Sequence, residues 1–273
     1  MDQQFPTQSV IADGAGWRLS SVHCNAKVGE RHAEERHGHH VIALVQSGTF
    51  TYHGTHGRAL LHAGALLLGR KDTCYSCGHD HADGDHCFAF QMDDWFFRDL
   101  AGEVTGKSGY EFPLSRVRAK ASWLQPFAAL HYARNCATRD ERAIAFAEAV
   151  IAGLSETLSE RSVSLRDELR IGRVLRHIDN EWDAPLDLQH LASIARMSRF
   201  HFLRVFRRLT GLTPHQHIIR LRLTAVVRRL FESNESVTSI AMSCGFGDLS
   251  TFNHAFRRVF GHTPTACRRS TSS

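Results

Sequence analysis

The sequence FRRLTGLTP at residues 206–214 returns fifty residues later as FRRVFGHTP at residues 256–264. Both copies follow the pattern Phe-Arg-Arg-x-x-Gly-x-Thr-Pro, and a repeat at this period is typical of a supersecondary unit that a chain uses twice. A short apolar helical segment and a turn precede each copy, at residues 191–198 and 240–248. A helix, a tight turn and a helix that ends in paired arginines form the layout of a helix-turn-helix DNA-binding motif. The sequence therefore predicts two such motifs in tandem.

The second helix of each predicted motif has an apolar face and a polar face. The apolar faces consist of Phe202, Val205, Phe206 and Leu209 in the first motif, and of Phe252, Ala255, Phe256 and Val259 in the second. The opposite faces, together with the residues near each helix start, comprise Arg199, Phe200, Leu203, Arg204 and Arg207, and Ser250, Thr251, Asn253, His254 and Arg257. Because the start of a recognition helix approaches base edges and later arginines meet phosphates, we expect these residues to contact DNA.

The distribution of charge supports this prediction. Residues 167–273 contain 16 Arg, no Lys and nine Asp or Glu, a formal charge of +7, whereas the whole chain carries +5. The preceding residues therefore carry −2, and the basic excess belongs entirely to the part with the repeat. Such an excess compensates phosphate charge, and the forked guanidinium group binds phosphate or guanine through two hydrogen bonds.

Two further helices are predicted in this C-terminal part. Apolar residues at helical spacing predict an amphipathic helix over residues 170–182, with Ile171, Val174, Leu175 and Ile178 inward. A long linking helix is expected to begin at Thr213-Pro214, because threonine can cap a helix and proline is favoured in its first position.

Residues 167–273 resemble the DNA-binding domain of the AraC/XylS family of bacterial transcription regulators. The resemblance is carried by Leu191-Ala192, Gly211-x-Thr213-Pro214, Ile240-Ala241 and Cys244-Gly245-Phe246, and by the second copy of the repeat with the preceding Phe252. It implies two helix-turn-helix units held by the linking helix, with recognition helices in successive major-groove turns on one face of the DNA. It also implies base contacts at Arg199, Phe200, Leu203 and Arg204, and at Ser250, Thr251, Asn253 and His254. Phe200 and Leu203 depart from the hydrogen-bonding side chains expected there, and either contact thymine methyl groups or pack within the protein.

Residues 1–120 read as short strands separated by turns that contain glycine. Residues 41–45 and 49–52 flank Gln46-Ser47-Gly48, which predicts a hairpin, and further strands are expected at residues 65–68 and 87–90. This part resembles the cupin-like sensor domain common in the same family, which implies a small β-barrel. His37-Gly38-His39 supplies the first histidine pair of a metal-binding cupin enzyme, but the glutamate that should follow it is missing. The pattern favours a barrel that senses a signal and argues against an oxygenase.

Apolar residues between residues 121 and 160 recur at helical spacing and predict two helices joined near residues 138–140. These helices either pack on the barrel or form the seam of a homodimer, and both alternatives stay open. Residues 160–164 are a polar candidate linker. The predicted fold is α+β, with a cupin-like sensor domain at residues 1–120, a helical dimerisation and linker segment at residues 121–165, and an all-α DNA-binding domain at residues 166–273.

Cysteine and histidine are concentrated in residues 74–87, a stretch of 14 residues with three Cys and three His. The spacing Cys-x-His-x-His-x5-Cys offers two thiolates and two imidazoles, a suitable set for tetrahedral zinc. We therefore expect Cys77, His79, His81 and Cys87 to bind one zinc ion. A polar loop of unlinked side chains is the alternative, because short motifs also arise by chance. The remaining cysteines outside this stretch, expected to be thiols without a role, are Cys24, Cys136, Cys244 and Cys267.

The chain shows no export signal and no apolar stretch long enough to span a bilayer. We therefore expect a cytoplasmic protein, in which cysteines are thiols or metal ligands rather than disulfides.

Two classes of function fit these features. The favoured one is a transcription regulator without catalytic residues that binds double-stranded promoter DNA as a homodimer and acts on RNA polymerase. Its N-terminal domain would respond to a metal or small-molecule effector. The alternative is a zinc-thiolate methyl-accepting DNA repair and regulatory protein similar to the Ada type. Because such a protein normally uses four cysteines, the sequence favours the regulator.

Overall fold

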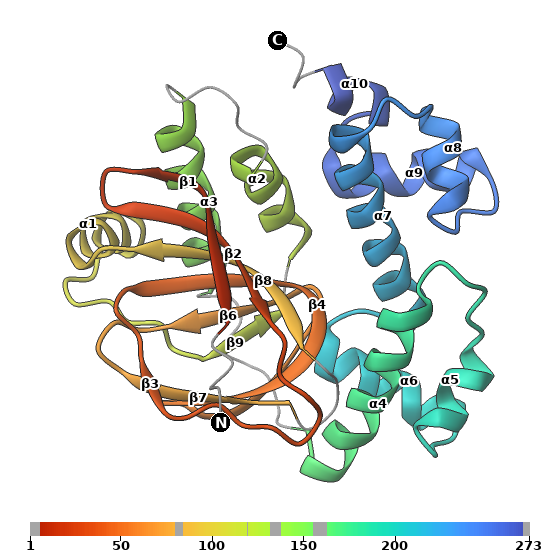
Figure 1. Cartoon of the computed structure of the whole chain (residues 1–273), viewed down its shortest axis with the longest axis horizontal. Coiled ribbons are helices and arrows are strands. Elements are labelled where there is room, and N and C mark those ends of the chain that lie inside the picture. The colour runs from red at the N-terminus through yellow and green to blue at the C-terminus, as the bar shows by residue number, and fades with distance from the viewer. Residues whose placement is uncertain (1–5, 80–83, 119, 132–137, 155–162, 270–273) are drawn as a thin grey trace. The chain divides into compact units, whose positions relative to one another are not determined.

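A computed structural model describes residues 6–79, 84–118, 120–131, 138–154 and 163–269 of the 273-residue chain. The chain divides into two compact units, Met1–Ser162 and Val163–Ser273 (Figure 1). The first unit combines strands with helices and the second is helical, which confirms the predicted α+β class. No helix among the described residues is long and apolar enough to cross a membrane.

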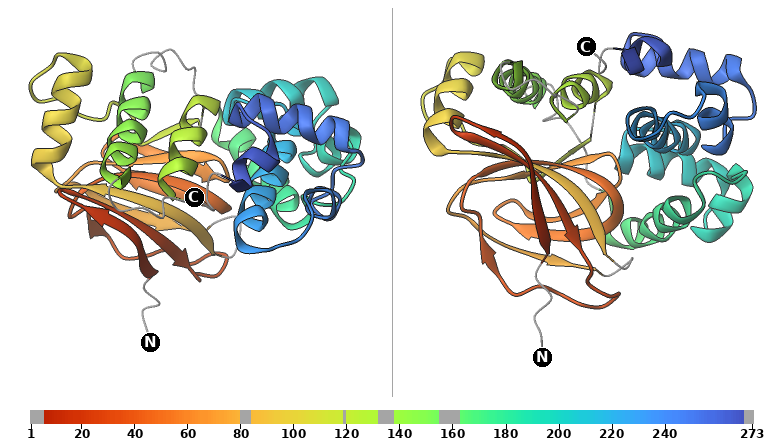
Figure 2. Two further views of the ribbon diagram at one scale, coloured as in Figure 1. Left: turned by 90° about the horizontal axis from the view of Figure 1, so that it is seen from above. Right: turned by 45° about the horizontal axis from the view of Figure 1, so that its top comes forward.

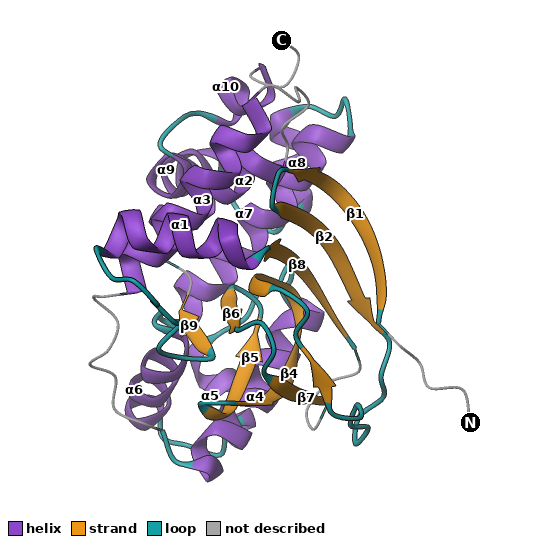
Figure 3. Ribbon diagram, turned by 90° about the vertical axis from the view of Figure 1, so that its left-hand side faces the viewer, coloured by secondary structure: helices purple, strands orange, loops and turns teal. Residues whose placement is uncertain are grey.

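Antiparallel strands form one sheet in the first unit. They are β1 (Thr7–Gly14), β2 (Trp17–Cys24), β3 (Glu35–Arg36), β4 (His40–Gly54), β5 (Gly57–His62), β6 (Ala65–Gly69), β7 (Cys74–Gly78), β8 (Asp85–Met92) and β9 (Arg116–Arg118). Strands β1, β2, β8, β4, β6 and β9 are hydrogen-bonded in that order, whereas β5 and β7 pair with the far end of β4 and β3 pairs with β7. The sheet therefore curls around β4 (Figure 3).

The strand β4 is continuous where the sequence predicts a hairpin at Gln46-Ser47-Gly48. The hairpin prediction is wrong. The register of β4 against β8 shifts between Val45 and Ser47, and Gly48 has a φ of 85°, so the strand bends there instead of reversing. The residues before the bend pair with β6 and β8, and those after it pair with β5 and β7. The reversal comes later, between Gly54 and Gly57.

Strand alternation gives the curled sheet two apolar faces. Along β4, Ile42 and Leu44 belong to one core cluster, whereas Val41, Ala43 and Val45 belong to another. Successive side chains of a strand point to opposite faces, so one strand contributes to both clusters. The side chains of the second cluster line the inner side of the curled sheet.

The outer face of the sheet packs against α1 (Asp94–Thr105), α2 (Ala121–His131) and α3 (Arg139–Leu154) (Figure 2). The apolar stripes of α2 and α3, which include Trp123 and Phe146, lie in the same core cluster as the strand residues. Packing of these two helices on the sheet is thus confirmed, and α1 is a helix that the sequence did not predict. The homodimer stays a prediction, and it requires other side chains because the stripes are buried within the unit.

The second unit is helical throughout its described residues. Its helices are α4 (Leu165–Glu181), α5 (Leu188–Ile194), α6 (Arg199–Thr210), α7 (Pro214–Glu232), α8 (Val237–Ser243), α9 (Leu249–Phe260) and α10 (Pro264–Arg269). Helices α5 and α6 form the first predicted motif, α8 and α9 form the second, and α7 connects them (Figure 1). As predicted, α7 begins with Thr213 as cap and Pro214 in its first turn, and the side chain of Gln216 completes a capping box.

Candidate functional site

The recognition helix of the first motif, α6, starts after Ser198, whose hydroxyl accepts a hydrogen bond from the backbone N–H of His201. Phe202 and Phe206 are fully buried beneath the helix and fix which face it shows to solvent. The predicted DNA contacts Arg199, Arg204 and Arg207 are exposed on the other side. The facing inferred from helical spacing is therefore correct for α6.

The two apolar residues predicted to contact DNA from α6 behave differently. Phe200 is 83% exposed, whereas Leu203 is partly buried. A phenylalanine so exposed contributes nothing to the core of its own unit. Packing of Phe200 within the second unit is therefore excluded, and its contact with a thymine methyl group stays a prediction.

The recognition helix of the second motif, α9, starts after Asp248, whose carboxylate accepts a hydrogen bond of 2.7 Å from the backbone N–H of Thr251. Hydrogen bonds from the backbone and the side chain of Thr251 lower the pKa of Asp248. Phe252 and Phe256 are fully buried beneath α9. The predicted DNA contacts of this helix are all exposed: Ser250, Thr251, Asn253, His254 and Arg257.

The turns of the two motifs use left-handed backbone conformations. Arg196 has a φ of 51° in the first motif and Gly245 has a φ of 82° in the second. A Cβ atom on Gly245 would lie 2.5 Å from the carbonyl oxygen of Asp183. Glycine is thus required in the second turn for both its dihedral angle and its close packing.

Arg222 of α7 ties the end of α4 to the turn of the second motif. Its guanidinium group donates hydrogen bonds to the carbonyl oxygens of Trp182 (2.7 Å), Ala184 (2.9 Å) and Gly245 (2.5 Å). Burial lowers the pKa of Arg222, and the nearby Asp183 carboxylate opposes that effect. The role of Arg222 could not be predicted from the sequence, because its three acceptors are main-chain groups that leave no residue pattern.

Comparison with known proteins agrees with this geometry. The family described as "Helix-turn-helix domain" matches residues 191–270. The transcriptional activator RhaS of Klebsiella pneumoniae (strain 342) is 24% identical over 249 residues, which cover 86% of this chain and 87% of RhaS. The probable transcriptional regulator LumQ of Photobacterium leiognathi is 30% identical over 120 residues, which cover 42% of this chain and only 48% of LumQ.

Among solved structures, a transcriptional regulator of Chromobacterium violaceum described by its AraC-type DNA-binding domain is 23% identical. The match covers 39% of this chain and 95% of the Chromobacterium violaceum chain, with a TM-score of 0.36. Residues 191–270 are thus similar to the helix-turn-helix domain of transcription regulators. This matching segment lies within the second unit.

The first unit contains a cavity of about 240 Å³ on the inner side of the curled sheet. Its apolar lining comes from the inner core cluster, including Val41, Ala43 and Phe50. Its polar lining is rich in metal-binding side chains: Cys24, His32, Glu35, His37, Cys77, His79, Asp85 and Cys87.

Strand pairing explains why these side chains converge. Cys24 on β2 lies opposite Asp85 on β8, and Cys87 lies two residues farther along β8 on the same face. Residues 30–32 continue the sheet beside the end of β7, because the N–H of His32 donates to the carbonyl of Cys77 and the N–H of His79 donates to that of Glu30.

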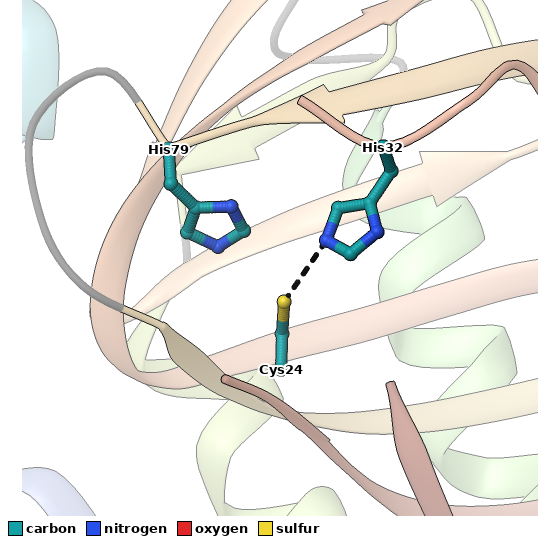
Figure 4. A group of neighbouring side chains, drawn as sticks. All are labelled: Cys24, His32 and His79. Atoms are coloured by element: carbon teal, nitrogen blue, oxygen red, sulfur yellow. Dashed lines mark hydrogen bonds between the residues drawn. The ribbon is translucent and has the colours of Figure 1, made fainter. Parts of the chain in front are cut away.

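The ligand atoms of Cys24, His32 and His79 lie within 4.8 Å of one another (Figure 4). Sγ of Cys24 is 3.1 Å from Nε2 of His32. Cys24 and His79 are buried, and His32 is partly exposed.

Asp85 holds two of the neighbouring groups. One carboxylate oxygen is 2.8 Å from Nε2 of His79, and the other accepts a hydrogen bond of 3.2 Å from the thiol of Cys87. Burial lowers the pKa of His79, but Asp85 and the nearby Cys24 sulfur outweigh it and raise that pKa to about 9. Burial, reinforced by Asp85, raises the pKa of the Cys77 and Cys87 thiols.

The four residues predicted from sequence to bind zinc are distributed as follows. His79 belongs to the three-residue cluster, Cys77 and Cys87 line the same cavity, and His81 lies outside the described residues. Cys24, expected to have no role, and His32 were missed. The pairing of β2 with β8 places Cys24 there, and the main-chain hydrogen bond from His32 to Cys77 places His32.

The histidines of the pair His37-Gly38-His39 do not converge on one site. The Nε2 atom of His37 is 2.9 Å from the hydroxyl of Tyr52, and its ring stacks on Tyr75. Burial, reinforced by the neighbouring His40, lowers the pKa of His37 to about 4. His39 is partly exposed and contacts Asp93 instead. The separation of the two histidines agrees with the missing glutamate, which argues against the metal site of a cupin oxygenase.

Proposed function

We propose that this protein is a transcription regulator of the AraC family that recognises promoter DNA by inserting α6 and α9 into successive major-groove turns. We further propose that its first unit controls DNA binding in response to a metal ion or small molecule. The observation that carries the DNA part is the pair of capped helices whose predicted contact residues, Leu203 apart, are exposed while the opposite faces are buried. The cavity lined by polar groups in the first unit supports the effector part.

Two partners besides DNA follow from this proposal. RhaS, which matches most of the chain, is described as a transcriptional activator, so we expect activation through RNA polymerase at the promoter. We also expect a homodimer, the commonest oligomer of soluble proteins, which analytical ultracentrifugation of the full chain tests. None of the relatives named above is described as a methyl-accepting repair protein.

Selection of binding sites from random duplex DNA with the full chain tests the base contacts. Phe200→Ala, Arg204→Ala and His254→Ala should each relax the preference at roughly one base pair, by ~1–3 kcal/mol. For Phe200→Ala the lost preference should be for thymine, because an aromatic ring contacts the thymine methyl group.

Arg257→Ala is the matched control from the same surface. Its position late in α9 favours a phosphate contact, so this variant should weaken binding to all sequences about equally. A change in the preferred operator with Arg257→Ala, or an unchanged preference in all three other variants, would contradict the proposed docking of the helices.

A further inference from the structure

Cys24, His32 and His79 come from three separate segments and meet at the cavity of the first unit (Figure 4). Cys24 ends β2, His79 follows β7, and His32 lies in the segment that pairs with the end of β7. Main-chain hydrogen bonds of 2.9 Å hold His32 and His79 in this register. The arrangement is therefore built by the sheet and does not depend on a chance meeting of surface side chains.

The two ring nitrogens of His79 have different surroundings. Nε2 is 2.8 Å from Oδ1 of Asp85, whereas Nδ1 is buried and has no hydrogen-bond partner among the described residues. His79 itself is completely buried. An unsatisfied buried nitrogen costs free energy unless a ligand occupies it. A carboxylate on the other ring nitrogen is the arrangement that orients histidines toward metal ions in proteins.

The donor set identifies the kind of ion. One thiolate and two imidazoles suit borderline-soft divalent ions such as Zn²⁺ and are a poor set for Mg²⁺ or Ca²⁺. Tetrahedral zinc holds such ligand atoms about 3.3–3.6 Å apart. The 3.1 Å between Cys24 and His32, and the limit of 4.8 Å for the whole cluster, allow this geometry after small side-chain movements.

We propose that Cys24 Sγ, His32 and Nδ1 of His79 bind one Zn²⁺ ion, whose fourth coordination position opens to the cavity and accepts water or a small-molecule donor. Asp85 fixes His79 from behind without binding the metal. The metal site stands independently of the DNA-binding proposal. Only an effect of zinc on operator binding rests on the proposed control by the first unit.

This ligand set differs from the one that the sequence spacing predicts. Cys77 and Cys87 line the same cavity, but their sulfur atoms are not part of the group whose ligand atoms lie within 4.8 Å. The thiol of Cys87 instead donates to Asp85. The two sets share His79, and substitutions at the cysteines separate them.

Metal content tests the proposal on the full chain. After removal of metal with a chelator, Zn²⁺ titration should give one ion bound per chain, and Co²⁺ in its place should produce a near-ultraviolet thiolate-to-cobalt absorption band. Cys24→Ser, His32→Gln and His79→Gln should each lose stoichiometric zinc, and Cys24→Ser should also lose the cobalt band.

Two cysteines supply matched controls. Cys74→Ser changes an exposed thiol of β7 outside the cavity, and Cys77→Ser changes a thiol that lines it; both should keep zinc and the cobalt band. Circular dichroism checks folding, and the partly exposed His32 supplies a ligand variant with little effect on the core. Retention of zinc by any of the three ligand variants, its loss in Cys77→Ser, or no stoichiometric binding by the native chain would overturn the site.

The test of zinc binding and the test of DNA binding can fail independently. Operator binding by the same protein samples is measured by itself, and failure of zinc binding with operator binding intact would overturn the site alone. Loss of operator recognition in a chain that still binds zinc would overturn the DNA proposal alone.

Discussion

At the scale of single residues, backbone conformation explains why the second motif carries glycine in its turn. Gly245 combines a φ of 82° with a carbonyl oxygen 2.5 Å from the position of a Cβ atom. The corresponding turn of the first motif uses Arg196 at a φ of 51°, where a side chain is accommodated at some cost in strain. The two motifs therefore share a left-handed turn, but the residue that adopts it is arginine in the first motif and glycine in the second.

Gly245→Ala should destabilise the second unit by about 2 kcal/mol or more, because the left-handed conformation and the contact with Asp183 both penalise a methyl group. Urea unfolding of residues 163–273 measures the change. Gly247→Ala is the control, since nothing lies within 4 Å of its Cβ position and its φ is not in the left-handed region, and it should change stability by less than about 1 kcal/mol. Equal stability of the two variants would contradict the assigned turn.

At the scale of elements, α7 connects the two motifs and packs against α6 of the first and α8 of the second. Its contribution depends on a charged side chain as well as on apolar packing, because Arg222 satisfies three main-chain carbonyl groups at once. These groups follow α4 and close the turn before α9, so one guanidinium group links the end of α4 to the second motif.

Arg222→Met should destabilise the second unit by roughly 2–4 kcal/mol, since hydrogen bonds to a charged donor are strong and the partly buried carbonyl groups lose their partner. Arg228→Met on the same helix is the control. Arg228 is largely exposed and its ion pair with Glu232 spans 3.8 Å, so a change within about 0.5 kcal/mol is expected. Urea unfolding followed by circular dichroism measures both, and similar losses in the two variants would show that Arg222 has no special role.

At the scale of the whole molecule, charge and core are divided between two units. Residues 167–273 carry the basic excess and form their own compact unit with buried apolar residues on every long helix. The first unit has two apolar clusters, one against its helices and one inside its curled sheet beside the cavity. The proposed DNA binding and the proposed ligand binding therefore belong to different compact units.

Residues 163–273 alone should bind duplex DNA with an affinity that falls steeply with salt, because arginines displace counterions from phosphates. For about four phosphate contacts, the affinity should drop on the order of a hundredfold between about 50 and 200 mM salt. Fluorescence anisotropy with labelled DNA measures the slope. Arg207→Ala should reduce that slope by about one phosphate contact, and a flat salt dependence of the native fragment would contradict the electrostatic basis of binding.

The sequence by itself determined the second unit in detail. The capping residues, the helical spacing of Phe202 and Phe206, and the repeat at residues 256–264 are local signals, since helix hydrogen bonds and caps join residues three or four apart. The cavity and its cluster were decided only by tertiary structure. Sheets join residues that are distant in the chain. The spacing of the sequence therefore predicted ligands only between Cys77 and Cys87. The pairing of β2 with β8 adds Cys24 to the cluster, and β4 bends at Gly48 within the same curled sheet.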